Sequence, residues 1–333
     1  MTARLSVAIP TYNGSRYIRE ALDSIISQLG DIDEEIEIVI SDNASTDQTP
    51  EIIREYQEKY SLIKYFRNEE NLGPDRNFGL AVRRSTGEYV WLFSDDDKFK
   101  NGAIKKVLGV LKDHPGLAAI FVNWGSWSPD LKQCNHERVL DIQKDILFKT
   151  ADDFLSTVKL NTIFVSSNII RRSLWEQAHP EIYVGTNWIQ YATLLTFIVD
   201  HYSYCIAEPY VMYRAGNIHW DKHSEISVKN TISLMRILNN LTERGYSRRS
   251  INKAIMVITR HLPMEIIAFK KNGLVLREFH IKDMITQFKF RPSFWIVDLP
   301  LLLLPNQIYR SRIARLVYRT AKKGYKKLKG ELP

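Results

Sequence analysis

The chain has 333 residues, of which 44% are apolar and 25% charged, a composition typical of a globular protein with a sizeable core. Its two cysteines, Cys134 and Cys205, lack the spacing of a disulfide framework or a metal site, and no apolar leader precedes the first strand-like run. We therefore expect a reducing, cytoplasmic location. Residues 291–333 hold ten basic and two acidic residues, which account for the whole net charge of +8. The neutral remainder argues against nucleic-acid binding.

Strand and helix signals alternate over the first 125 residues. Apolar runs predict strands at 5–10, 35–42, 62–68, 87–97 and 117–125. Amphipathic patterns predict helices between them, at 15–29, 47–60, 73–85 and 102–115. The first of these helices has Ser15 as a candidate N-cap. This alternation predicts parallel β-α-β units with right-handed crossovers, in which ligands bind at the carboxyl ends of the strands.

The pattern changes after residue 125. Segments 153–158, 162–175 and 188–199 are the clearest elements up to residue 225, and residues 226–290 are predicted to be helical. We expect one domain over 1–225, divided into a nucleotide-sugar half (1–125) and an acceptor half (126–225). A helical extension (226–290) and a basic amphipathic segment (291–333) follow it.

Polar residues follow the predicted strands and should meet in one crevice. Asp95 and Asp97 can present two carboxylates to one Mg²⁺ or Mn²⁺ ion, with positions left open for substrate phosphates. Asp42 could accept hydrogen bonds from a base or ribose, and Arg76 could pair with phosphate or base oxygens. These residues predict a nucleotide diphosphate held by a metal. Neither GxxxxGK[ST] nor GxGxxG is present, which disfavours a P-loop NTPase and an NAD enzyme.

Four segments in this order resemble the successive motifs of inverting family 2 glycosyltransferases with the GT-A fold. They are SVAIPTYNGSRYIREALDSI, IVISDNASTDQT, RNEENLGPDRNFGLAV and GEYVWLFSDDDKF. The resemblance is dense over residues 5–125 and weaker up to about 225. It implies an α/β, Rossmann-like fold, in which helices flank a mostly parallel sheet and a helical C-terminal extension follows. It also implies transfer of a sugar from a nucleotide diphosphate donor.

The resemblance also implies roles by position. Asp95 and Asp97 occupy the DxD positions, Asp97 as the direct ligand of Mn²⁺ or Mg²⁺. Asp42 is implied to bind the base. The other residues implied to bind the nucleotide sugar are Pro10, Thr11, Tyr12, Arg76, Asp96 and Arg214.

The sequence departs from the family where the catalytic base is expected. An inverting transfer needs a carboxylate that takes the proton of the acceptor hydroxyl. Thr186 and Asn187 stand at the expected acidic positions, and Asn cannot act as a base. Glu181 is the nearest upstream carboxylate and our candidate, while Asp200 is the nearest downstream.

A second departure lies in EPYVMYRAGNIHWDKH, residues 208–223. Its Pro209, Tyr213 and Arg214 match a later motif of the family, but the usual histidine does not follow. Three nearby residues could replace it, of which the first is also a candidate metal ligand: His219, Asp221 and His223.

The resemblance favours a metal-dependent, inverting glycosyltransferase that moves a hexose or deoxyhexose to a lipid-linked saccharide acceptor, and it implies a role in O-antigen or other surface polysaccharide synthesis. Two alternatives stay open. A sugar-nucleotide pyrophosphorylase should have a glycine-rich loop, which PTYNGSRY is not. A catalytically degenerate nucleotide-sugar-binding protein would account for Asn187.

The C-terminal segment is predicted to lie on an anionic membrane surface, on the cytoplasmic face of the inner membrane. FWIVDLPLLLL (294–304) is too short to span a bilayer, which takes about 20 apolar residues. Beyond Pro305 a helical projection separates an apolar side from a basic side, the pattern of an interfacial helix. The basic side holds Arg312, Arg315, Arg319, Lys322, Lys323, Lys326 and Lys329.

Overall fold

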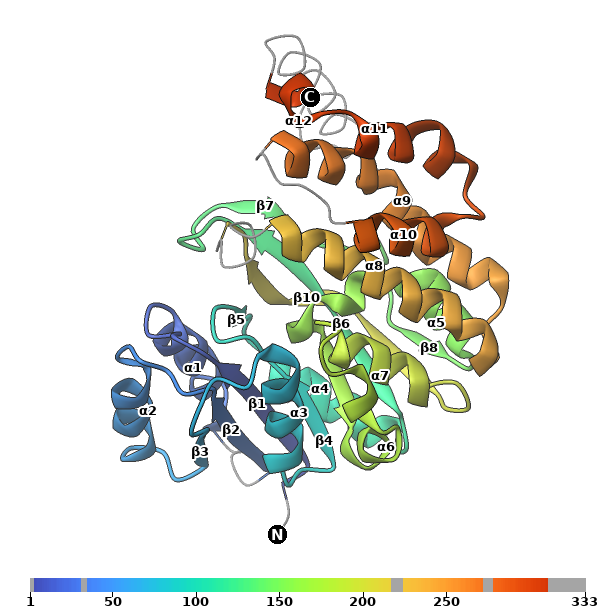
Figure 1. Cartoon of the computed structure of the whole chain (residues 1–333). Coiled ribbons are helices and arrows are strands. Elements are labelled where there is room, and N and C mark those ends of the chain that lie inside the picture. Colours follow the sequence, from blue (N-terminus) through green and yellow to red (C-terminus); the bar gives the residue numbers. More distant parts are fainter. Residues whose placement is uncertain (1–2, 31–34, 217–223, 272–277, 311–333) are drawn as a thin grey trace. The chain divides into compact units, whose positions relative to one another are not determined.

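The structure is a computed structural model that describes residues 3–30, 35–216, 224–271 and 278–310. Within these residues a ten-stranded sheet has the order β3-β2-β1-β4-β9-β6-β10-β5, with β7 paired to β6 and β8 to β10 (Figure 1). The strands are β1 (Leu5–Thr11), β2 (Ile36–Asp42), β3 (Ile63–Arg67), β4 (Tyr89–Leu92), β5 (Lys98–Phe99), β6 (Ala119–Trp127), β7 (Cys134–His136), β8 (Ile146–Phe148), β9 (Asn168–Arg171) and β10 (Ser203–Arg214).

Helices flank the sheet and continue beyond it toward the C-terminus. They are α1 (Ile18–Ile26), α2 (Thr49–Gln57), α3 (Pro74–Arg84), α4 (Ala103–Asp113), α5 (Ala151–Val158), α6 (Arg172–Gln177), α7 (Ile189–Phe197), α8 (Ser224–Asn240), α9 (Arg248–Lys271), α10 (Glu278–Phe288), α11 (Leu299–Leu303) and α12 (Asn306–Arg310). The predicted α/β fold, a mostly parallel sheet flanked by helices with a helical C-terminal region, is confirmed.

The four N-terminal strands are parallel, as the alternation predicts. Thr11 of β1 pairs with Asp42 of β2, and Ala8 pairs with Leu92 of β4, so the carboxyl ends of these strands meet at one edge. β9 is antiparallel to both of its neighbours, β4 and β6, which the sequence did not predict. It places residues that precede β9 beside the end of β4.

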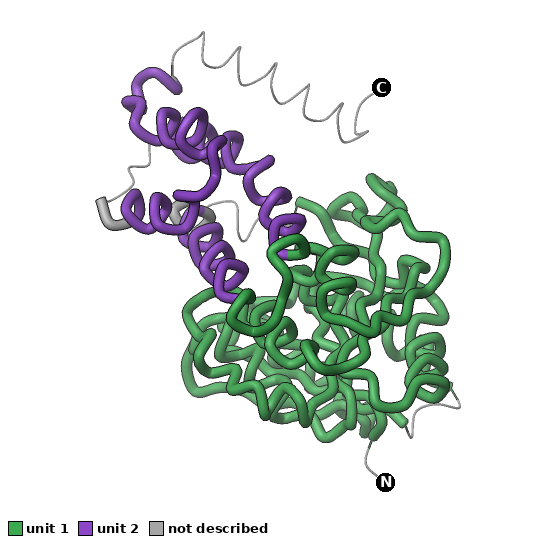
Figure 2. The backbone as a smooth tube through the Cα atoms, turned by 90° about the vertical axis from the view of Figure 1, so that its right-hand side faces the viewer, with its two compact units in different colours: residues 1–217, 241–250 green, residues 218–240, 251–333 purple. Residues whose placement is uncertain are grey.

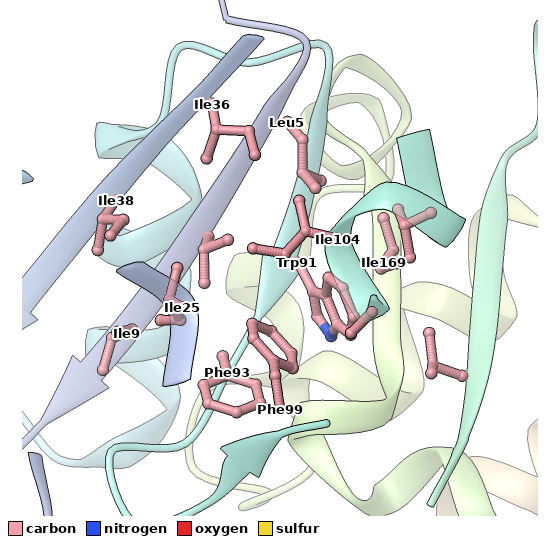
Figure 3. Packing of buried hydrophobic residues seen from close by; sticks show 14 of the residues in the cluster. Leu5, Ile9, Ile25, Ile36, Ile38, Trp91, Phe93, Phe99, Ile104 and Ile169 are labelled. Atoms are coloured by element: carbon pink, nitrogen blue, oxygen red, sulfur yellow. The ribbon is translucent and has the colours of Figure 1, made fainter. Parts of the chain in front are cut away.

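An aromatic cluster fixes the chain on both sides of the three aspartates. Phe93 precedes them and Phe99 follows them, and their ring centroids lie 4.0 Å apart (Figure 3). Trp91 packs on Phe99 with ring centroids 4.2 Å apart. All three side chains are buried in the core. Because both ends of the 94–98 segment are held in the core, its aspartates form a short turn of fixed position.

The predicted N-cap at Ser15 is wrong. α1 begins at Ile18, and its N-cap residue is Tyr17, which makes no side-chain cap. The backbone N–H of Ser15 instead donates to Asp47 Oδ2 (3.1 Å), in the turn after β2. This long-range bond connects the loops that follow β1 and β2, which local capping preferences do not reveal.

The chain divides into two compact units (Figure 2). The first comprises Met1–Asn217 and Leu241–Ser250 and contains the sheet; the second comprises Ile218–Asn240 and Ile251–Pro333. In the second unit the described secondary structure is helical. Among the described residues, no helix combines the length and the apolar character that crossing a bilayer requires.

Candidate active site

The loops after β1 and β2 are joined by hydrogen bonds at the carboxyl edge of the sheet. Asn43 N donates to Thr11 O (2.9 Å), and Asn13 N donates to Ser45 Oγ (2.9 Å). Asn13 Oδ1 accepts from Thr46 N (2.8 Å). The two loops therefore form one rigid wall, and Tyr12 is exposed on it.

The aspartate turn lies against this wall. Asp95 Oδ2 accepts a hydrogen bond from Thr11 Oγ1, so the predicted convergence of Thr11 and Asp95 is confirmed. Asp97 is 1% exposed, and its two oxygens accept from different parts of the chain. Ser166 Oγ donates to Asp97 Oδ2 (2.6 Å), and Arg214 N donates to Asp97 Oδ1 (3.1 Å). The turn is thus held by β1, by the segment before β9 and by β10.

The Arg214 side chain also holds the aspartate turn in place. Its guanidinium donates to Asp96 O (2.8 Å), to Pro129 O (2.6 Å) and to Glu20 Oε2 (3.0 Å). It also stacks on Tyr17 of the α1 N-terminus, 4.1 Å from the ring centroid. Because the side chain is 1% exposed, its visible role is to position the aspartates. Direct contact of Arg214 with the nucleotide sugar stays a prediction.

The carboxylates of this turn crowd one another in a poorly solvated place. Burial and the neighbouring charge of Asp96 raise the pKa of Asp95 to about 7. The same two causes raise the pKa of Asp97 well above its usual range. Asp95 and Asp97 therefore bind protons more tightly than ordinary aspartates do, and a nearby positive charge would favour their ionised forms.

This arrangement fits a divalent cation. Carboxylates are the hard oxygen ligands that Mg²⁺ and Mn²⁺ prefer, and a dication would remove the repulsion that raises both pKa values. Across the described ranges, however, no three His, Cys, Asp or Glu side chains are grouped to hold a metal ion. Among the described residues, Asp95 and Asp97 would supply two carboxylates, and a bound diphosphate and water could add further oxygen ligands.

Asp42 and Arg76 lie in contrasting environments. Asp42 is completely buried and accepts from Ser45 N (2.9 Å) and Tyr65 OH (2.7 Å), with Arg67 Nε 3.4 Å from its carboxylate. These contacts hold the turn after β2. Arg76 is exposed on the first turn of α3. The contacts of both residues with a nucleotide stay predictions.

The loop at the expected base position is held by Asp75, a residue that the sequence reasoning missed. Asp75 is 5% exposed, and its carboxylate accepts from the backbone N–H groups of Gly185 (2.8 Å), Asn187 (2.8 Å) and Ile189 (3.3 Å). It therefore caps the start of α7 from another helix. Asn187 has a φ of 63°, a left-handed conformation that Asn tolerates better than most residues. No local signal could reveal Asp75, because its partners lie more than 100 positions away.

Glu181 lies at the surface, in the turn Pro180–Tyr183. Its side chain is 64% exposed and contacts His179 Nδ1 (3.1 Å). A hydrogen bond from its own backbone N–H, and then the contact with His179, lower the pKa of Glu181. None of its hydrogen bonds or ion pairs among the described residues reaches the aspartate turn. His219, Asp221 and His223 lie outside the described residues.

A network of asparagines was also missed. Asn43 Oδ1 accepts from Asn68 Nδ2 and from Leu72 N (both 2.9 Å), and Asn77 Nδ2 donates to Ser41 O (2.8 Å). These side chains are almost completely buried and connect the ends of β2 and β3 to the start of α3. The asparagines of "SDN" and "RNEEN" at strand ends, and of "DRN" at the start of α3, are the sequence signal for this network, but Asn is also common in turns.

A sequence profile described as glycosyl transferase family 2 matches residues 6–177. Abequosyltransferase RfbV of Salmonella typhimurium is 49% identical over 94 residues, 28% of this chain and 28% of that protein. A GalNAc(5)-diNAcBac-PP-undecaprenol beta-1,3-glucosyltransferase of Campylobacter jejuni is 30% identical over 164 residues, 47% of this chain and 52% of that protein. The alignments thus span about half or less of these relatives.

Solved structures resemble nearly the whole chain. Staphylococcus aureus TarS 1-349 in complex with UDP-GlcNAc has a TM-score of 0.66 and 17% identity, covering 98% of this chain and 92% of that one. Mannosyltransferase PcManGT from Pyrobaculum calidifontis, in complex with GDP-Man and Mn²⁺, has a TM-score of 0.54 and 18% identity, covering 91% and 86%. At these identities the likeness shows a common fold.

Gly14 provides a test of the packing around Asp95. A Cβ at this position would overlap both Asp95 Oδ2 and Thr11 Oγ1. We expect Gly14→Ala to displace the Asp95 carboxylate and to weaken Mn²⁺-dependent binding of nucleoside diphosphates by at least about tenfold, a displacement cost of about 1.4 kcal/mol. Isothermal titration measures this. Gly109→Ala is the control, because nothing lies within 4 Å of a Cβ there. Equal affinities for both variants would contradict the assigned packing.

Proposed function

The chain belongs to glycosyl transferase family 2, and from this premise we propose that it transfers a hexose or deoxyhexose from a nucleotide diphosphate sugar to a lipid-linked saccharide acceptor, with inversion at the anomeric carbon. The observation that carries the proposal is the aspartate turn at the carboxyl edge of the sheet. There, Asp95 accepts from Thr11 at the end of β1, and Asp97 accepts from Ser166 and from the Arg214 backbone. That edge is where open α/β sheets bind ligands.

In this proposal Asp95 and Asp97 hold Mn²⁺ or Mg²⁺. The cation, when bound, neutralises charge that grows on the departing diphosphate. Thr11 orients Asp95, while Ser166 and the Arg214 backbone orient Asp97. Arg76, exposed on α3, is placed to pair with a phosphate. Pro10 and Tyr12 form part of the wall against which the nucleotide packs.

The proposed reaction also requires a group that takes the proton of the acceptor hydroxyl. The acceptor oxygen attacks the anomeric carbon, the bond from that carbon to the diphosphate oxygen breaks, and the acceptor proton passes to a carboxylate. We propose that this carboxylate is Glu181, which lies in the turn before the 185–189 loop. Asp75 holds the adjacent 185–189 loop in place.

The acceptor class rests on the relatives. One carries abequosyltransferase in its name, and another names an undecaprenol-linked saccharide as its substrate. The second name supports a lipid-linked acceptor, and we propose a role in O-antigen or other surface polysaccharide synthesis. Membership of the family sets the pyrophosphorylase alternative aside. The experiments below test the other alternative, a catalytically degenerate binding protein, which Asn187 suggests.

We further propose that the C-terminal region binds the cytoplasmic surface of an anionic membrane. Several large apolar side chains between residues 290 and 308 are exposed, and Phe290 (85%) and Ile296 (75%) are the most exposed of them. The others are Trp295, Val297, Leu303, Leu304 and Ile308. The basic helix predicted beyond them lies outside the described residues. Each Lys or Arg near anionic lipid contributes about 1 kcal/mol.

Removing one ligand carboxylate tests the transfer reaction. We expect Asp97→Asn to lower turnover by at least about 100-fold. The amide would hold the divalent cation less tightly than the carboxylate does, and that cation is proposed to offset the charge on the leaving diphosphate. Release of nucleoside diphosphate from a panel of sugar nucleotides, with crude lipid extract present, measures turnover. Asp113→Asn, at an exposed site on α4, is the control. Nucleotide binding without any turnover in the wild type would support the degenerate binding protein instead.

The assignment of the base is tested separately. Glu181→Gln should reduce kcat by about 100-fold or more and leave donor affinity unchanged, since the proton moves only during the reaction. Glu176→Gln, which affects an exposed glutamate paired with Arg172, is the control. An unchanged kcat for Glu181→Gln would move the role of the base to another carboxylate.

Membrane binding is tested by placing charge on the exposed apolar surface. Phe290→Asp with Ile296→Asp should abolish co-sedimentation with anionic vesicles at low salt, because both side chains would have to bury a carboxylate in lipid. Met256→Asp alters another exposed apolar residue of the helical unit and should leave vesicle binding intact. Wild-type protein that stays in the supernatant would contradict the membrane proposal.

A further inference from the structure

A pocket lies beside the aspartate turn, in the part of the first unit built by β5, β6 and β10. Its wall includes Lys100 directly after β5, Trp127 at the end of β6, and Glu208 and Pro209 within β10. Cys134 of β7, and Glu137 and Arg138, which follow it, complete the wall. None of these residues takes part in the site described above.

Short connections join the pocket to the aspartates. Trp127 lies opposite Arg214 in the β6–β10 ladder, and Trp127 O accepts from Ala215 N (2.9 Å). Arg214 N is the group that donates to Asp97. On the other wall, Lys100 follows Asp97 by three residues through β5. A ligand in this pocket would therefore lie next to the residues assigned to the leaving diphosphate.

A β-bulge shapes the pocket floor. The register between β10 and β6 shifts between Ile206 and Val211, so four residues of β10 stand where β6 has one. The bulge is fixed on both sides, because Asn123 Nδ2 donates to Ala207 O (2.8 Å) and Lys100 N donates to Tyr210 O (2.7 Å). Bulges commonly turn a side chain toward a functional site. Here the bulge carries Glu208 and Pro209.

The segment at 136–137 forms the opposite wall of the pocket, and its backbone lies very close to Gly125 of β6. A Cβ on Gly125 would lie 2.5 Å from Glu137 O and 2.9 Å from His136 O, so only glycine lets this segment lie against β6. Val139 N donates to Trp124 O (2.9 Å) and holds it there. The position of Glu137 relative to Trp127 is therefore built into the sheet.

The chemistry of the lining selects a ligand class. The half-buried Trp127 supplies an aromatic ring, which can cover the apolar face of a sugar ring. The Glu137 and Glu208 side chains are exposed and, among the described residues, have no hydrogen-bond or ion-pair partner, so they can accept from hydroxyl groups. Lys100 and Arg138 balance the two carboxylates. A lining without net charge favours a neutral ligand over a phosphate.

We propose that this pocket binds a neutral saccharide unit of the acceptor, stacked on Trp127 and hydrogen-bonded by Glu208 and Glu137. The proposal rests on the proposed function, and it assigns the acceptor side of the reaction to the β5–β10 end of the sheet. Trp127 and Glu208 are then specificity-determining residues.

Saccharide binding is measured without any donor, so its result is independent of the transfer reaction. The probes are methyl glycosides of glucose, galactose, mannose, rhamnose and N-acetylglucosamine, and the readout is saturation-transfer NMR on the full chain. We expect at least one to bind the wild type and Trp127→Ala to weaken that binding by about tenfold or more, as loss of a central aromatic anchor does. Trp127→Phe should keep most of the affinity, and Glu208→Ala should lose much of it.

Glu58→Ala, at an exposed site after α2, is the matched control and should bind like the wild type. Addition of UDP, GDP or CDP with Mg²⁺, which is diamagnetic, should leave the saccharide signals in place, because the two sites are distinct. Loss of the signals on adding nucleotide would overturn the acceptor assignment. Absence of binding in the wild type, or equal binding by Trp127→Ala, would overturn the pocket itself. If saccharides bind but nucleotides do not, the transfer proposal fails and the pocket stands.

Discussion

The pair of hydrogen bonds on Asp97 is the constraint on which the site depends. One carboxylate oxygen accepts from Ser166, just before β9, and the other accepts from the backbone of Arg214 in β10. A nearly unexposed carboxylate is costly unless its oxygens are satisfied, so these two bonds also hold β9 and β10 in register with the turn. The aromatic packing of Phe93 on Phe99 fixes the two ends of the same turn. Displacement of either segment would leave a buried acceptor unpaired.

The same turn separates two kinds of surface. On one side lie the loops after β1 and β2, which are joined by backbone and side-chain hydrogen bonds. On the other side lie β5, β6 and β10, where a bulge and an aromatic residue form the pocket. The inverting transfer proposed above needs the acceptor on the face of the anomeric carbon opposite the diphosphate, and the pocket proposed for the acceptor lies across the aspartates from these loops.

The raised pKa values of Asp95 and Asp97 are a reason to propose that the turn binds a cation. Burial and mutual repulsion raise the proton affinity of Asp95 and Asp97, so the ionised forms are stable only with a compensating cation nearby. Arg214 does not provide that compensation, because its guanidinium is directed to Glu20 and to two backbone carbonyls. The protein thus uses its buried arginine for architecture and leaves the carboxylates available.

The sequence by itself determined the first half of the fold and the place of the aspartate turn at its edge. Apolar runs such as 35–42 and the helices between them are local signals, and parallel strands necessarily bring Thr11, Asp42 and Asp95 to one edge. Only the tertiary structure decided what depends on distant partners. Ser15 bonds to Asp47 and does not cap α1; Asp75 caps α7 from more than 100 positions away; and the bulge at Glu208 is defined only against β6. Hydrophobic periodicity reports which face of an element is buried, whereas a polar side chain can satisfy its hydrogen bonds with any group that the fold brings near. The position of such a partner is therefore fixed by the packing of the whole sheet.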